Sequence, residues 1–131
     1  MADFSAQAVV NSVLMKAFPS DPIVGEEDAK DLRVPEGAAL KEKVVQLTNS
    51  VLQQEDAQLT EAQVLDAIDY GVYAGGPTGR HWALDPIDGT LGFLRGEQFA
   101  VCLALIVDGV IKVPCRACVC VCVWELTWNN S

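Results

Sequence analysis

The chain has 131 residues, half of them hydrophobic, and its 18 acidic and 9 basic residues give a formal net charge of −9. This length suits one domain with a sizeable core, while the negative charge excludes nonspecific binding to nucleic acids or acidic membranes, which would repel it. No apolar run approaches the ~20 residues of a membrane-spanning helix, and the start lacks the basic and apolar regions of a signal peptide, so we expect a cytoplasmic protein with reduced cysteines.

Apolar residues at helical spacing predict three helices in the first half of the chain. The first covers about residues 5–17, and the second carries the apolar series from Leu40 to Leu52. The third begins at Thr60, where Thr60 and Gln63 form the pattern of a capping box. Between the first two helices, Ile23 and Val24 predict a short strand.

Strands are predicted in the second half, after the turn signal Gly75-Gly76-Pro77. His81 to Leu84 has the pattern of a short buried strand. Two apolar runs follow, Phe99 to Val107 and Val110 to Val113, and the dipeptide Asp108-Gly109 between them favours a type I′ hairpin turn. Helices early in the chain and adjacent strands late in it predict an α+β fold.

Two acidic segments follow predicted strands. Asp85 and Asp88 flank a proline that fixes φ and precede a flexible glycine, so both carboxylates can converge on one point. The acids Glu26, Glu27 and Asp28 follow the other strand. Oxygen ligands suit Mg²⁺ better than zinc, and two ions ~3.5–4 Å apart would activate water and stabilise the leaving oxygen of a phosphate ester. A solvated acidic turn is the alternative that spacing alone leaves open.

Two separated motifs carry a resemblance to a known family. Gly25-Glu26-Glu27 and the later segment Trp82 to Thr90 resemble the paired signatures of the inositol monophosphatase superfamily of lithium-sensitive phosphatases. Within it, Gly92 to Val101 is similar to the extension typical of 3′(2′),5′-bisphosphate nucleotidases, and the resemblance runs from about Asp3 to Lys112. It implies a layered α/β sandwich of the inositol monophosphatase and sugar phosphatase type, of which this chain would be the amino-terminal part.

The resemblance implies an organisation and a function. Residues 1–113 would form a partial metal-binding phosphatase domain, and residues 114–131 a divergent tail rich in cysteine and valine. The expected reaction is Mg²⁺-dependent removal of the 3′-phosphate from 3′-phosphoadenosine 5′-phosphate, a small phosphorylated nucleotide, with no nucleic-acid or membrane partner. An inositol phosphate is the alternative substrate, and a noncatalytic fragment is the alternative to an enzyme.

The resemblance also assigns roles to individual residues. Ligands of the metal ions would be Glu26, Asp85, the main-chain carbonyl of Ile87, and Asp88. Asp3 and Thr90 would position and deprotonate the attacking water, while the backbone amides of Gly89 and Thr90 would hold the phosphate. Glu27 is the less certain acid of its pair.

Four features depart from the family pattern or stand outside it. Leu91 replaces the lysine that nucleotidases usually carry after Asp-Gly-Thr, and the family's last metal-binding aspartate, in a Trp-Asp motif, does not occur in these 131 residues. Cys118, Cys120 and Cys122 would lie ~6.5 Å apart along one strand face, too wide for zinc–sulfur bonds of ~2.3 Å. The sole histidine, His81, is expected to be structural.

Overall fold

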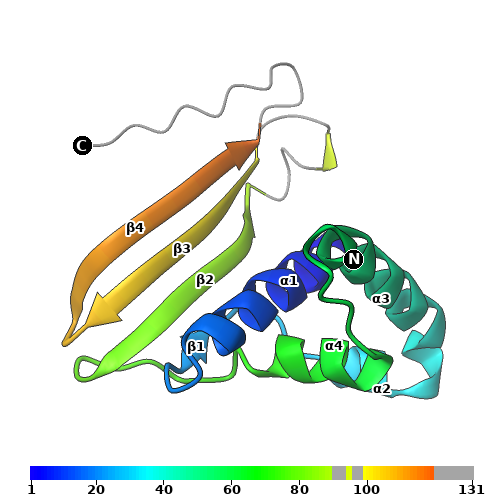
Figure 1. Cartoon of the computed structure of the whole chain (residues 1–131), viewed down its shortest axis with the longest axis horizontal. Helices are drawn as coiled ribbons and strands as arrows, with labels where there is room; N and C mark the ends of the chain where they lie inside the picture. Colours follow the sequence, from blue (N-terminus) through cyan, green and yellow to red (C-terminus); the bar gives the residue numbers. More distant parts are fainter. Residues whose placement is uncertain (90–93, 96–98, 120–131) are drawn as a thin grey trace.

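Helix α1 lies between a four-stranded sheet and the other helices, in a computed structural model that describes residues 1–89, 94–95 and 99–119 (Figure 1). The α-helices are α1 (Ala2–Ala17), α2 (Lys30–Arg33), α3 (Ala38–Leu52) and α4 (Glu61–Asp69), with 3₁₀ turns η1 (Pro35–Gly37) and η2 (Gln53–Glu55). The three predicted helices are confirmed, although α1 begins earlier than expected. The short helix α2 was not predicted.

The capping box predicted at the start of α4 is present. Thr60 Oγ1 accepts a hydrogen bond from the Gln63 amide at 3.3 Å, and Gln63 Oε1 accepts one from the Thr60 amide at 2.9 Å. These two bonds satisfy amides that a helix start otherwise leaves without partners. The local sequence therefore fixes where α4 begins.

The sheet has the strand order β1 (Ile23–Val24), β2 (Arg80–Asp88), β3 (Phe99–Val107) and β4 (Val110–Val119). Strand β1 is parallel to β2, and the other neighbours are antiparallel. The β3–β4 turn has φ of 49° at Asp108 and 77° at Gly109, as a type I′ turn requires. Helices and a mixed sheet together confirm the predicted α+β fold.

Two strands extend beyond their predicted ends. Strand β2 continues through the acidic segment to Asp88, and β4 continues to Val119. Strand β4 therefore pairs with β3 on both sides of residue 113, after which we expected a tail to begin. The division of the chain at that residue remains a prediction. Within the described part of the chain, no helix has both the length and the apolar character needed to cross a membrane.

The core has two parts that meet at α1. One lies among α1, α2, α3 and α4, and its buried members are Ala8, Ala29, Leu32, Val44, Val64, Leu65, Ala67 and Ile68. The other joins α1 to the sheet through Leu14, Ile23, Trp82 and Leu105. Each large buried aliphatic side chain stabilises the fold by roughly 1.5–3 kcal/mol. Packing on both sides of α1 therefore holds its first turn in place beside the sheet.

We expect Asp69→Ala to lower the free energy of unfolding by about 1–2 kcal/mol, because its carboxylate ties α4 to α2 through charge-assisted hydrogen bonds. Asp69 Oδ1 accepts from the Ala29 amide at 2.7 Å, and Oδ2 accepts from Arg33 Nη2 at 2.7 Å. Asp66 binds the same guanidinium, but its side chain is 70% exposed. Asp66→Ala is therefore the matched control, with an expected loss below about 0.5 kcal/mol. Equal losses in urea denaturation would contradict this.

Candidate metal centre

Glu26 and Asp85 come together because β1 and β2 are parallel neighbours. Val24 pairs with Ala83, so Glu26, two residues beyond the end of β1, comes close to Asp85, two residues further along β2. The carboxyl ends of parallel strands are where α/β proteins place polar ligands. The pairing thus explains how two acids far apart in the sequence become neighbours.

A β-bulge brings Asp88 onto the face that carries Asp85. In a regular strand, residues three apart point to opposite faces. Here Asp85 pairs with Cys102 and Asp88 with Ala100, so β2 has one extra residue between the two acids, in the segment Pro86–Ile87. The extra residue therefore puts the Asp88 side chain on the same face of β2 as that of Asp85. On that face, Cys102 Sγ lies 3.9 Å from Asp88 Oδ2. The ladder between β2 and β3 is thus irregular between the two acids.

The acids raise each other's affinity for protons. Burial raises the pKa of Glu26 from its ordinary value of 4.5, and the charges of Asp85 and Asp3 and a hydrogen bond with Asp85 raise it further. Burial also raises the pKa of Glu27, together with the charges of Asp3, Glu26 and Asp28, against an opposing effect of the amino terminus. Raised pKa values show that the negative charges of these neighbouring carboxylates are unfavourable to one another. A bound divalent cation would neutralise those charges.

Asp85 has an oxygen that suits a cation. Among the described residues, its Oδ1 is one of the buried side-chain atoms without a hydrogen-bond partner, and a buried carboxylate oxygen without a partner is unfavourable. A hard cation would supply the missing interaction. Across residues 1–89, 94–95 and 99–119, however, no three acid, cysteine or histidine side chains are gathered closely enough to hold an ion on their own.

The other residues with expected roles are placed as follows. Asp3 lies in the first turn of α1, close enough for its charge to act on Glu26. Ile87 lies in the bulge with its side chain buried, and Gly89 follows β2 with a φ of 85°. Thr90 lies outside the described residues. Asp3, Glu26 and Asp85 are thus brought into one neighbourhood, and the roles of all these residues remain predictions.

Gln7 is a residue of this neighbourhood that the sequence did not reveal. It is fully buried in α1, and its side-chain amide bonds to the backbone of the acidic segment after β1. The only signal in the sequence was its place one helical turn after Asp3, on the same face of the helix. A polar residue at such a position is more often solvated, so the pattern gave no reason to single it out.

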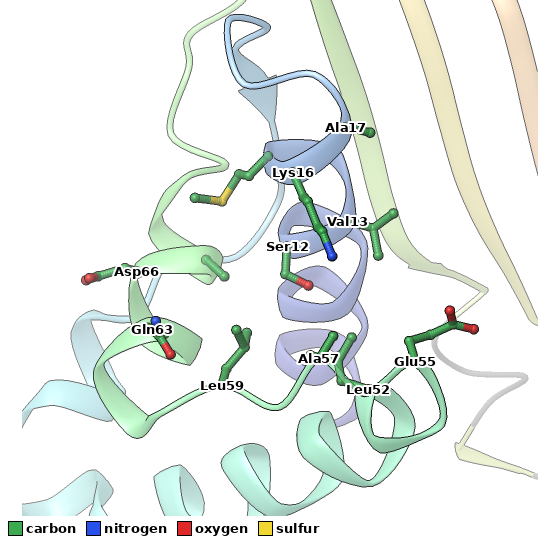
Figure 2. A pocket seen from close by; sticks show the side chains of 12 residues that line it. Ser12, Val13, Lys16, Ala17, Leu52, Glu55, Ala57, Leu59, Gln63 and Asp66 are labelled. Carbon is green, nitrogen blue, oxygen red and sulfur yellow. The ribbon is translucent and has the colours of Figure 1, made fainter.

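A large hollow of the described surface lies away from the acids. A cavity of about 1040 Å³ opens between the second half of α1, the segment after α3 and the start of α4. Figure 2 shows Val13, Leu52 and Leu59 around it, with Lys16 and Glu55 at its border. A smaller hollow of about 430 Å³ lies against Asp85 and is lined by Ala83, Cys102 and Leu103 among others. Only the smaller one adjoins the acid cluster.

Without a cation, the acid cluster should make stability depend on pH. A carboxyl group whose pKa is higher in the folded than in the unfolded chain binds more protons when folded, so the unfolding free energy falls as pH rises through that interval. The interval opens at the ordinary value of 4.5 and extends upward for Glu26 and Glu27. We expect chelator-treated protein to lose stability from that pH towards neutrality in urea denaturation. Glu26→Gln should flatten the dependence, and an unchanged slope would contradict its assignment to this cluster.

Comparison with known proteins agrees with the resemblance. The chain matches the inositol monophosphatase family over residues 1–122, which extends past Lys112 and includes the whole of β4. It is 46% identical over 125 residues to 3′(2′),5′-bisphosphate nucleotidase 1 of Candida albicans, covering 90% of this chain and 34% of that protein.

Two further relatives carry the same name. Identity is 48% over 124 residues to the 3′(2′),5′-bisphosphate nucleotidase of Schizosaccharomyces pombe, covering 90% of this chain and 35% of the relative. It is 43% over 137 residues to 3′(2′),5′-bisphosphate nucleotidase 1 of Arabidopsis thaliana, covering 100% of this chain and 39% of the relative. The chain therefore spans between a third and two fifths of the length of these curated relatives.

Proposed function

We infer the function of this chain from its family: it belongs to the inositol monophosphatase family, and we propose that it forms the metal-binding part of a phosphatase. The proposed reaction is removal of the 3′-phosphate from 3′-phosphoadenosine 5′-phosphate in the presence of Mg²⁺. The names of the relatives support this reaction. In this proposal residues 1–113 carry the metal site, residues 114–131 form a divergent tail, and the cysteine distribution favours the cytoplasm.

The observation that carries the proposal is the meeting of Glu26, just beyond the end of β1, with Asp85 in the parallel neighbour β2. The bulge adds Asp88 on the same face, and an unpartnered buried oxygen of Asp85 provides a position for a cation. All three groups are carboxylates, which Mg²⁺ prefers to the nitrogen and sulfur ligands of zinc. The carbonyl of Ile87 is the proposed fourth protein ligand.

The chain's own residues have distinct proposed tasks around the cation. Glu26, Asp85 and Asp88 hold it, and a bound Mg²⁺ supplies charge stabilisation at the attacking and leaving oxygens. Asp3 accepts a proton from water and is helped by Thr90. The amides of Gly89 and Thr90 orient the phosphate, as backbone donors do in many anion sites. The small hollow beside Asp85 provides an apolar wall next to this position.

A titration of the 131-residue chain with Mg²⁺, followed by calorimetry, tests the metal site directly. We expect weak saturable binding, which also raises the melting temperature because only the folded chain presents the ligands. Absence of binding would overturn the metal site and favour a noncatalytic fragment. An inositol phosphate is the alternative substrate that the family supports, and competition between the two phosphate esters for the metal-loaded chain distinguishes them.

A further inference from the structure

We propose that Gln7 is a positioning residue that holds the Glu26 and Glu27 backbone against α1 and so sets the geometry of the metal site. This inference rests on the proposed function, because it concerns the acids to which a metal role is given. Gln7 itself is fully buried inside the fold, below the acid cluster. It therefore acts through the residues it binds.

The Gln7 amide uses all of its hydrogen-bonding capacity on backbone groups. Its Oε1 accepts from the amides of Glu26 and Glu27 at 3.1 and 3.0 Å. Its Nε2 donates to the carbonyl of Glu27 at 2.7 Å and to that of Ile68 at 2.8 Å. A primary amide offers two donors and an oxygen with two lone pairs, so every bond it can make is made. One side chain thus ties three elements together: α1, the acidic segment and the end of α4.

Two glycines leave the space in which the Gln7 amide sits. A Cβ added to Gly25 would lie 2.7 Å from Gln7 Oε1, and one added to Gly71 would lie 2.9 Å from Gln7 Nε2. The amide of Gly25 also donates to the carbonyl of Gly71 at 2.7 Å. The amide group therefore lies in a slot that only glycine backbones on both sides can form. Such close enclosure leaves the acidic segment little freedom to shift relative to α1.

The same helix carries the proposed catalytic acid. Asp3 precedes Gln7 by one helical turn, so the two side chains share a face of α1. When Gln7 fixes the Glu26–Glu27 backbone on that face, it also fixes the distance between those acids and Asp3. Gln7 therefore couples the water-activating residue to a metal ligand without touching either ion or substrate.

Asn11 provides a matched control for this role. It is a fully buried amide one turn further along α1, and its Nδ2 donates to the carbonyl of Ala67 at 2.9 Å, next to the Ile68 carbonyl that Gln7 binds. Among the described residues, Asn11 makes no hydrogen bond with the acidic segment. Gln7→Met and Asn11→Leu both remove a buried amide without changing charge. Both substitutions should lower the free energy of unfolding, but only Gln7→Met should change how the backbone of Glu26 and Glu27 is held.

The experiment compares Mg²⁺ affinity by calorimetry and amide hydrogen exchange in the full 131-residue chain and both variants. We expect Gln7→Met to weaken Mg²⁺ binding by about 10–100-fold, as changes to groups that orient metal ligands do, and to speed exchange at the Glu26 and Glu27 amides. Asn11→Leu should change the affinity less than about twofold. Equal losses in both variants, or unchanged exchange at the two amides in Gln7→Met, would overturn the positioning role.

Gln7→Asn keeps the test decisive should Gln7→Met fail to fold. It keeps a buried amide and the same charge, but its side chain is one methylene shorter and no longer reaches the acidic segment, so exchange at Glu26 and Glu27 should be fast, whereas exchange as slow as in the unchanged chain would overturn the proposal. Failure of the unchanged chain to bind Mg²⁺ would instead overturn the proposed function. The exchange measurement distinguishes these two failures, because it reports whether Gln7 keeps the Glu26–Glu27 backbone in place, whether or not a cation binds.

Discussion

Asp85→Asn should weaken Mg²⁺ binding to this chain by at least about 100-fold in a calorimetric titration. Changes to groups that only orient a ligand typically weaken metal binding by about 10–100-fold, and Asp85 is proposed as a direct ligand. Its Oδ1 is buried without a hydrogen-bond partner, so the substitution removes charge at the point where a cation is best accommodated. Without Mg²⁺ the same change should relieve repulsion with Glu26.

Asp108→Asn is the control, because it makes the same change of charge at the far end of the sheet. Asp108 lies in the β3–β4 turn, where Oδ1 accepts from the Gly79 amide at 2.8 Å and φ is 49°. Asparagine keeps that acceptor and tolerates a positive φ, so Mg²⁺ affinity should be unchanged. If Asp85→Asn and Asp108→Asn had equal effects, a diffuse attraction of cations to the acidic chain would replace the proposed site.

The second large effect is expected from joining residues 1–112 to the remaining part of a curated relative. Release of phosphate from 3′-phosphoadenosine 5′-phosphate should rise at least about a thousandfold over the 131-residue chain by itself. A fixed cation contributes several kcal/mol to this class of reaction, and each 1.36 kcal/mol is worth about tenfold in rate. The relatives extend well beyond the aligned region, and the Trp-Asp motif that the resemblance assigns to metal binding is absent from this sequence.

Two measurements make this expectation refutable. Asp88→Ala in the joined protein should return phosphate release to the level without enzyme, because the bulge places that carboxylate on the same face of β2 as Asp85 and it is proposed as a metal ligand. Rapid Mg²⁺-dependent release by the unmodified 131-residue chain would show that the residues proposed to be missing are dispensable. A joined protein that is folded and inactive would show that the departures within this chain, such as Leu91, prevent catalysis.

Local patterns predicted the elements but not the contacts between them. The capping box at Thr60 and the turn at Asp108-Gly109 are set by neighbouring residues, so the sequence located both. The face of β2 on which Asp88 lies depends on a bulge in the pairing of β2 with β3. The spacing of the acids suggested that they converge, but it did not show by which backbone irregularity. The short helix α2 has four residues and is held by Asp69 from α4, so no periodicity could reveal it.

Gln7 is a second example, within the candidate site, of a contact that local sequence patterns could not predict. Its role comes from partners 20 and 61 residues away in the chain, and a glutamine in an amphipathic helix resembles any solvated polar residue. The acids were found because consecutive carboxylates are conspicuous in a sequence. The group that holds them was missed because its significance lies in tertiary structure alone.

The parallel pairing of β1 with β2 also has a consequence for the order of folding. The β3–β4 hairpin closes through a tight turn, whereas Asp21, just ahead of β1, meets Arg80 at the start of β2 across 59 residues of chain. Closing so long a loop is slow and entropically unfavourable, so β1 should join the sheet after the hairpin has formed. Glu26 and Asp85 lie on the two sides of that late contact. A cation that bridges them could bind only once this contact has formed, so it would stabilise the complete fold and not the hairpin alone.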